Sequence, residues 1–225
     1  MPLTPYGLRV WLPILLGMVA LSALFAWLGW WWAMWLAVAI GLALLSFFRD
    51  PIRRVKTDLP EGTMLSPADG AISAVLDVPH HKAVDGPAKI IRIFLSVLNV
   101  HVNRSPYDAT VVSMEHTPGK FLNAQTEESA KVNECNLIRL KIALNGHEEI
   151  IGVRQVSGML ARAIVCPIKA GDRLKRGQKF GMIKFGSTTE LILPRPNDVT
   201  VYVKKGDKVK GGVTVLATLK PARAT

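Results

Sequence analysis

The sequence has 225 residues, 49% of them hydrophobic, and 28 Lys and Arg against 17 Asp and Glu give a net charge of +11. This length accommodates a membrane segment followed by one domain of about 170 residues. A basic excess suits nucleic acid or an anionic membrane, but all six Trp precede residue 36 and no basic stretch alternates with stacking aromatics, which argues against nucleic acid.

Residues 11–48 carry no charged side chain. A single helix over this span would be about 57 Å long, roughly twice the 30 Å hydrocarbon core of a bilayer. We therefore expect a hairpin of two helices with its turn near Leu28-Gly29-Trp30. Five tryptophans would then gather at the far interface, where indole rings prefer to lie: Trp27, Trp30, Trp31, Trp32 and Trp35.

Positive residues flank this segment on both sides: Arg9 before it, and Arg49, Arg53, Arg54 and Lys56 after it. They place both ends in the cytoplasm, which requires an even number of crossings. A cleaved signal peptide would have a shorter apolar core; a single tilted helix with an interfacial stretch stays as an alternative. We expect residues 1–58 to form the anchor and a basic linker, and residues 59–225 to form a domain on the cytoplasmic side of the cell (inner) membrane.

After the linker, turn residues separate short runs rich in Val, Ile and Thr, which is typical of a mainly β fold with few helices. The expected strands are 70–78, 89–95, 109–114, 136–144, 149–156, 180–185, 199–203 and 213–219. The helix candidates are Gly158–Val165 and a turn around Gln125–Lys131. The sequence has two cysteines, Cys135 and Cys166, which is too few for a zinc site. We expect reduced thiols rather than a disulfide.

A weak repeat lies near the C-terminus. Gly171-Asp172-Arg173-Leu174-Lys175-Arg176-Gly177 returns as Gly206-Asp207-Lys208-Val209-Lys210-Gly211-Gly212, and each copy leads into an apolar strand. Such turns resemble those of lipoyl and biotinyl carrier domains and related barrel-sandwich modules. Two copies predict a paired, sandwich-like arrangement. No lysine occupies the hairpin tip that a carrier domain would modify.

Between the two copies lies Phe185-Gly186-Ser187-Thr188-Thr189, which contains the only Gly-Ser step in the sequence. It separates the apolar runs 180–185 and 191–193. Taken alone, this stretch predicts an ordinary turn.

Five stretches together resemble, in order and spacing, the short, membrane-anchored branch of the phosphatidylserine decarboxylase proenzymes. They are Leu65–Gly70, Phe94–Pro106, Pro118–Ala124, Ala161–Cys166 and Lys184–Thr188. The resemblance covers nearly all of residues 60–220. It implies an enzyme that makes a covalent pyruvoyl cofactor from its own serine and uses neither a metal nor pyridoxal phosphate.

The resemblance assigns the cleavage to Gly186 and Ser187. Ser187 attacks the carbonyl of Gly186 and turns the amide into an ester, and glycine leaves this approach open. A serine hydroxyl needs a base to remove its proton. β-Elimination then releases the upstream chain and leaves dehydroalanine, which hydrolyses to pyruvoyl and ammonia. The expected products are a large subunit, 1–186, and a small subunit, 187–225.

His101 and Asp69 occupy the family positions of the base and of the carboxylate that orients it, following the logic of Ser-His-Asp sites. Read without the resemblance, Asp69 before a glycine is an ordinary turn residue and His101 a core histidine. Some relatives carry another histidine where this chain has Leu98. This departure leaves open whether His101 or one of His80, His81 and His116 also serves as the proton donor.

The implied reaction converts phosphatidylserine to phosphatidylethanolamine. The substrate amine forms a Schiff base with the pyruvoyl carbonyl, CO2 leaves, and the ketone takes up the electrons as pyridoxal phosphate does elsewhere. His101 would then protonate Cα. Arg104, Lys120 and Arg162 are candidate contacts for the anionic head group.

Other interpretations stay open on the residues alone. An anchored lipoyl-like adaptor without enzymatic activity explains the anchor and the paired turns, but not why Asp69, His101 and Gly186-Ser187 occur together. A serine hydrolase would normally show a Gly-x-Ser-x-Gly elbow, which this sequence lacks. A related serine phospholipid such as archaetidylserine is an alternative substrate, and the sequence leaves homo-oligomer formation open.

Overall fold

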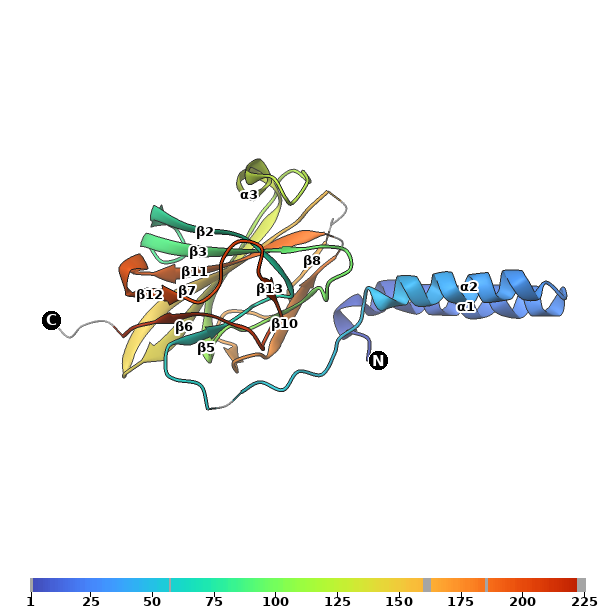
Figure 1. Cartoon of the computed structure of the whole chain (residues 1–225), viewed down its shortest axis with the longest axis horizontal. Helices are drawn as coiled ribbons and strands as arrows, with labels where there is room; N and C mark the ends of the chain where they lie inside the picture. The colour runs from blue at the N-terminus through green and yellow to red at the C-terminus, as the bar shows by residue number, and fades with distance from the viewer. Residues whose placement is uncertain (1, 57, 160–162, 185, 222–225) are drawn as a thin grey trace. The chain divides into compact units, whose positions relative to one another are not determined.

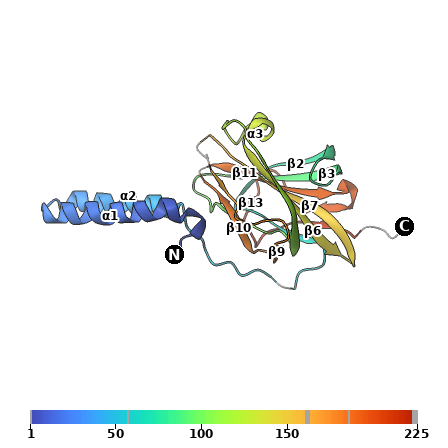
Figure 2. The same cartoon turned by 180° about the vertical axis from the view of Figure 1, so that it is seen from behind.

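The computed structural model describes residues 2–56, 58–159, 163–184 and 186–221. The chain divides into two compact units, Met1–Ile52 and Arg53–Thr225. Figures 1 and 2 show an N-terminal pair of helices and a domain made mainly of strands.

The first unit is a helical hairpin, as predicted. A short 3₁₀ turn, η1 (Pro5–Gly7), leads into α1 (Leu8–Trp27), and α2 (Trp31–Ser46) returns alongside it (Figure 1). Gly29 makes the turn with a φ of +74°, a value that favours glycine. By length and composition, Pro5–Trp27 is sufficient to cross a membrane, whereas α2 is shorter, with 16 residues.

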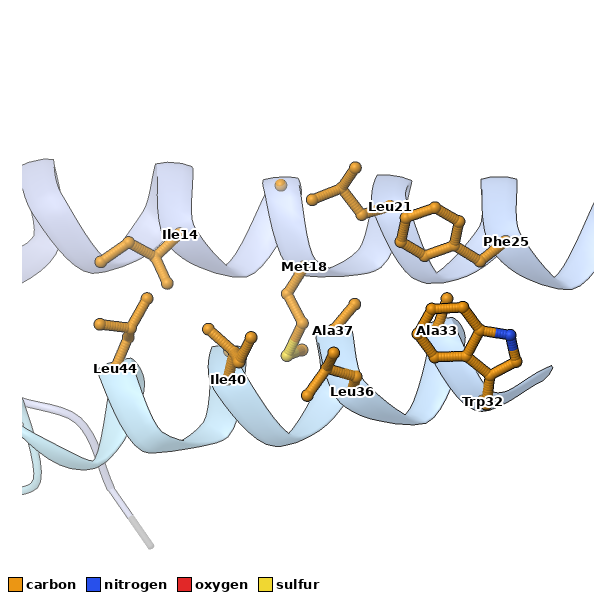
Figure 3. Close-up of a pocket in the computed structure, with 12 residues that line it drawn as sticks. Ile14, Met18, Leu21, Phe25, Trp32, Ala33, Leu36, Ala37, Ile40 and Leu44 are labelled. Atoms are coloured by element: carbon orange, nitrogen blue, oxygen red, sulfur yellow. The ribbon is translucent and has the colours of Figure 1, made fainter. Parts of the chain in front are cut away.

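The two helices leave an apolar groove of about 440 Å³ between them (Figure 3). Met18 of α1 lies against Gly41 of α2, where a side chain would collide with it. The side chains outside this groove are apolar too, since Trp27 is 82% exposed and Trp35 is 65% exposed. Apolar side chains all around a helix pair suit a lipid environment rather than water.

The second unit is mainly made of strands (Figures 1 and 2), which pair into three sheets. The eight-stranded sheet has the order β13-β2-β3-β11-β7-β6-β5-β9, and the small sheets have the orders β1-β14-β12 and β4-β10-β8. The bounds are β1 Thr63–Leu65, β2 Gly70–His81, β3 Gly86–Leu95, β4 Val102–Arg104, β5 Ala109–Thr117, β6 Cys135–Leu144, β7 His147–Val156, β8 Ile164–Val165, β9 Arg173–Leu174, β10 Lys179–Ile183, β11 Ser187–Pro194, β12 Val199–Val201, β13 Lys208–Val209 and β14 Val215–Leu219.

The mainly β prediction is confirmed, and each expected strand has an observed counterpart with shifted ends. The helix predicted at Gly158–Val165 is wrong within the described residues. Met159 lies in a bend, and Ile164–Val165 form β8, which pairs with β10. Two consecutive β-branched residues favour that strand. The predicted turn near residue 125 contains α3 (Glu127–Val132), whose N-cap Thr126 accepts a hydrogen bond from the Ser129 N–H at 3.2 Å.

The repeated Gly-Asp turns occupy equivalent places. β9 pairs with β5 at one edge of the large sheet, and β13 pairs with β2 at the other. Gly171 and Gly206 have φ values of +92° and +97°. Each following Asp accepts a hydrogen bond from the backbone N–H of the lysine three residues before it, at 2.8 and 2.9 Å. The predicted paired arrangement is therefore present as a two-fold pseudo-symmetry.

The strand pairing obeys the same symmetry. β2·β13 corresponds to β5·β9, β3·β11 to β6·β7, and β1·β14 to β4·β10, with the β7–β11 pair at the centre. The hydrophobic core combines the large sheet with residues of the small ones, such as Met64 and Phe180. β11 therefore lies at the middle of the domain, and the connection from β10 to β11 joins the two halves.

Candidate active site

The Gly186–Ser187 step lies at the start of β11. Gly186 has a φ of +62°, a left-handed backbone conformation that glycine adopts more easily than other residues. Ser187 is the first residue of β11; it pairs with Leu95 of β3 and is fully buried. The expectation of a turn is therefore wrong for Ser187, Thr188 and Thr189, which are strand residues. β-Branched Thr188 and Thr189 extend the apolar run that follows them into the strand.

Two features single out this peptide bond. The Ser187 hydroxyl is buried and has no hydrogen-bond partner among the described residues, a state that native structures seldom leave unexplained. The carbonyl oxygen of Gly186 lies so close to Gly158 that a Cβ there would collide with it. Gly158 thus leaves room for the Gly186 carbonyl. Nothing in its sequence context indicates this role, because the contact joins two distant segments.

His101 contacts the backbone N–H of Gly186, which belongs to the peptide bond preceding the Gly186–Ser187 step. Its side chain is fully buried, its Nδ1 is 2.9 Å from the carbonyl oxygen of Asn99, and the Gly186 N–H donates to its Nε2 over 3.4 Å. A carbonyl accepts and does not donate, so Nδ1 carries the proton and Nε2 presents its lone pair toward the Gly186–Ser187 step. The structure therefore brings His101 and Gly186 together.

Asp69 makes two other contacts. Its Oδ2 pairs with Arg53 Nη2 at 2.6 Å, and its Oδ1 accepts the Gly211 N–H at 2.8 Å. Its symmetry counterpart, Asp108, accepts the Arg176 N–H at 2.9 Å in the same way. The Gly211 contact thus belongs to the repeated turn, whereas the partly buried ion pair with Arg53 has no equivalent at Asp108 among the described residues. The acceptor placed at His101 Nδ1 is the Asn99 carbonyl, so the expected orienting role of Asp69 stays a prediction.

A chain of buried side chains links the histidine and serine segments. Asn103, two residues after His101, donates to Thr189 Oγ1 at 3.0 Å, and Thr189 is two residues after Ser187. Gln155 of β7 donates to Asn103 Oδ1 at 2.8 Å, and Asn136 donates to Gln155 at 3.1 Å. Because side chains alternate along a strand, Ser187 and Thr189 share one face of β11. The network therefore fixes β4, which directly follows His101, relative to β11, which begins at Ser187, and sequence reasoning missed it.

A pocket of about 260 Å³ opens at Gly186. It is lined by both polar and apolar residues: Phe94, Ser96, Val97, Asn123, Ala124, Gln125, Met159 and Gly186. Thr188 ties one wall to β11 by donating to the Ala124 carbonyl at 3.1 Å.

Of the predicted head-group contacts that the structure describes, neither Arg104 nor Lys120 lines this pocket. Arg104 is 7% exposed and its guanidinium donates to the Gly177 carbonyl at 3.2 Å, in the turn of the first repeat copy. Lys120 is exposed, and its backbone bonds to Val132 and Glu134. Arg162 lies outside the described residues. The proposed roles of all three stay predictions.

The other candidate histidines lie on strands β2 and β5. His80 faces Asp85 at 3.7 Å, Nδ1 of His81 accepts the Ala83 N–H at 3.1 Å, and His116 is exposed on β5. Desolvation by burial lowers the pKa of His81. Burial raises the pKa of the Cys166 thiol to about 11, so Cys166 is protonated at neutral pH and is a poor nucleophile.

Comparison with known proteins gives a consistent result. The family profile described as phosphatidylserine decarboxylase matches residues 40–217. A phosphatidylserine decarboxylase proenzyme of Carboxydothermus hydrogenoformans is 40% identical over 219 residues, covering 97% of this chain and 98% of that protein. Proenzymes of the same name from Rhodopirellula baltica and Symbiobacterium thermophilum are 41% and 44% identical; they cover 96% and 81% of this chain and 88% and 83% of their own lengths.

Proposed function

The chain belongs to the phosphatidylserine decarboxylase family, and from that premise we propose that it decarboxylates phosphatidylserine with a pyruvoyl group made from its own Ser187. The observation that carries this proposal is the environment of the Gly186–Ser187 step. A buried serine hydroxyl, without a partner among the described residues, follows a glycine whose carbonyl has room on one side and whose own N–H meets His101 Nε2. The name proenzyme, borne by the relatives, accords with a chain that is processed after synthesis.

The chain's own residues supply the steps of the cleavage. Asn99 holds the Nδ1 proton of His101, so Nε2 is the atom that takes the proton of Ser187 Oγ, once it exchanges the Gly186 N–H for this hydroxyl. The hydroxyl oxygen then attacks the Gly186 carbon, the C–N bond breaks, and an ester joins the two segments. Removal of the Ser187 Cα proton expels the Gly186 carboxylate. Hydrolysis of the remaining enamine releases ammonia and leaves the ketone.

The residues around position 187 fit the group that this chemistry would leave. β11 is hydrogen-bonded to β3 on one side and to β7 on the other. β13 and β14, which follow it, pair with β2 and β1. A fragment 187–225 would therefore stay folded into the domain, with its new N-terminus at the pocket by Gly186. When present, the pyruvoyl ketone supplies an electron sink for the substrate amine.

The helical hairpin supports a membrane location. We propose that it crosses the inner membrane and that the domain lies on the cytoplasmic side, as the flanking Arg9, Arg53 and Arg54 indicate. Withdrawing a phospholipid costs about 0.8 kcal/mol per CH2, and so more than about 10 kcal/mol for one long acyl chain. An anchored domain avoids this cost because its site works at the bilayer surface.

The pseudo-symmetry offers a matched test of Asp69. On vesicles that contain phosphatidylserine, the unmodified chain should form phosphatidylethanolamine. Asp69→Asn should slow self-cleavage on the order of a hundredfold if this carboxylate supports the base. Asp108→Asn removes the same charge from the equivalent turn and should change little. Denaturing gels follow cleavage and lipid mass spectrometry follows the product.

The folding of both asparagine variants is checked by thermal unfolding. Equal rates of self-cleavage in the two variants would show that Asp69 serves only to build its turn. An unmodified chain that leaves phosphatidylserine intact would contradict the proposed function itself.

A further inference from the structure

Two exposed apolar side chains line the Gly186 pocket, and a third directly follows one of them in the chain. In the described part of the domain, the exposed large apolar residues are Leu76, Val97, Leu98, Val112, Met159, Tyr202 and Val213. Two of them, Val97 at 44% and Met159 at 58% exposure, line the pocket that contains Gly186. Leu98 follows Val97 directly and is 80% exposed. We call Val97, Leu98 and Met159 the apolar rim.

The turn that carries two of these residues is built by polar groups on either side of them. Asn99 Oδ1 accepts from both the N–H and the hydroxyl of Ser96, at 2.9 and 2.8 Å, and the Asn99 N–H donates to the Ser96 carbonyl at 2.9 Å. Turn tips in water normally carry polar residues, whereas this one presents valine and leucine. The Asn99 carbonyl in turn meets His101 Nδ1, so one tight turn connects the rim to the base.

The rim and the pocket wall have complementary chemistry. Ser96, Asn123 and Gln125 provide polar lining, and Val97 and Met159 provide exposed apolar lining. A phospholipid has the same two kinds of group, a polar head and apolar acyl chains.

We infer that the apolar rim lies in the membrane interface and contacts the acyl-glycerol part of the phospholipid whose head group enters the Gly186 pocket. This inference rests on the proposed function, because it takes a serine phospholipid as the substrate. Exposed apolar groups that adjoin a site mark a surface for an apolar partner, and this partner remains in the bilayer during the reaction. The rim therefore promotes the binding of lipid in a membrane more than the binding of lipid dissolved in water.

The test compares two substrates. Phosphatidylserine with long chains is presented in vesicles, and dihexanoyl-phosphatidylserine is presented in solution. The double variant Val97→Ser with Met159→Ser should lower the ratio of vesicle to soluble kcat/KM about tenfold, mainly through a higher KM on vesicles. The control, Val112→Ser with Tyr202→Ser, replaces equally exposed apolar groups elsewhere and should leave the ratio unchanged.

A second variant, Val97→Leu with Met159→Leu, keeps the rim apolar. It should have the same ratio of vesicle to soluble kcat/KM as the original chain, and it can be measured even if the serine variant fails to fold or to self-cleave. A ratio that is unchanged in the serine variant, or lowered equally in the leucine variant, would overturn the role of the rim. An unmodified chain inactive on both lipids would instead contradict the proposed function, so the two failures are distinguishable.

Discussion

Replacing Ser187 by alanine should keep the chain in one piece and abolish its decarboxylase activity. The change removes the only oxygen that attacks the Gly186 carbonyl in the proposed cleavage, and with it the source of the ketone. Fold stability should change little, because the hydroxyl makes no hydrogen bond among the described residues. A denaturing gel and a phosphatidylserine assay on the same preparation measure both effects.

Ser157→Ala is a matched control for this experiment. Ser157 is also buried close to the site, beside Gly158, but its hydroxyl already donates to the Glu134 carbonyl at 3.0 Å. This variant should still divide into two fragments. An unsplit Ser187→Ala protein that decarboxylates phosphatidylserine would refute the pyruvoyl assignment.

The second large effect is expected at His101. His101→Ala should slow self-cleavage by about 10²- to 10⁴-fold, the usual contribution of a positioned general base. His101 Nε2 is the basic atom that the structure places at the Gly186 amide. Time courses of fragment formation after synthesis in a cell-free system give the rate directly.

His116→Ala controls for the loss of an imidazole, since His116 is exposed on β5. Cleavage of His101→Ala at the unmodified rate would exclude His101 as the base for processing. Its place against Gly186 would then be explained by packing alone.

Composition and periodicity were sufficient to predict the helical hairpin and the strands of this molecule. An uncharged stretch too long for one crossing predicts the hairpin, and Gly29 marks its turn. Runs of β-branched residues predict the strands of the large sheet. Both depend on local sequence, in which each residue's preference agrees with its final environment.

The wrong predictions have a tertiary cause. Gly158–Val165 contains residues compatible with a helix, but the edge of β10 offers backbone partners to Ile164 and Val165, and pairing with them decides the outcome. Ser187 seemed to lie in a turn because it follows a glycine. Its pairing with Leu95 makes it a strand residue, and this pairing joins segments far apart in the sequence.

In the candidate site, too, some features follow from sequence motifs and others from contacts between distant segments. A pattern of five stretches proposes Gly186, Ser187 and His101 as site residues, and the structure brings His101 to the N–H of Gly186. The roles of Gly158 and Asn103 depend on contacts between distant segments, which no local motif records. The two contacts of Asp69 likewise arise from the fold: the pseudo-symmetry accounts for one, and the linker residue Arg53 for the other.

Denaturing mass spectrometry of the purified, unmodified protein tests the central claim most directly. The account predicts two polypeptides, residues 1–186 and residues 187–225. The smaller should have a blocked N-terminus whose mass shifts after reduction by borohydride, as a ketone requires. A single intact mass that spans position 187 and is unchanged by borohydride would contradict it.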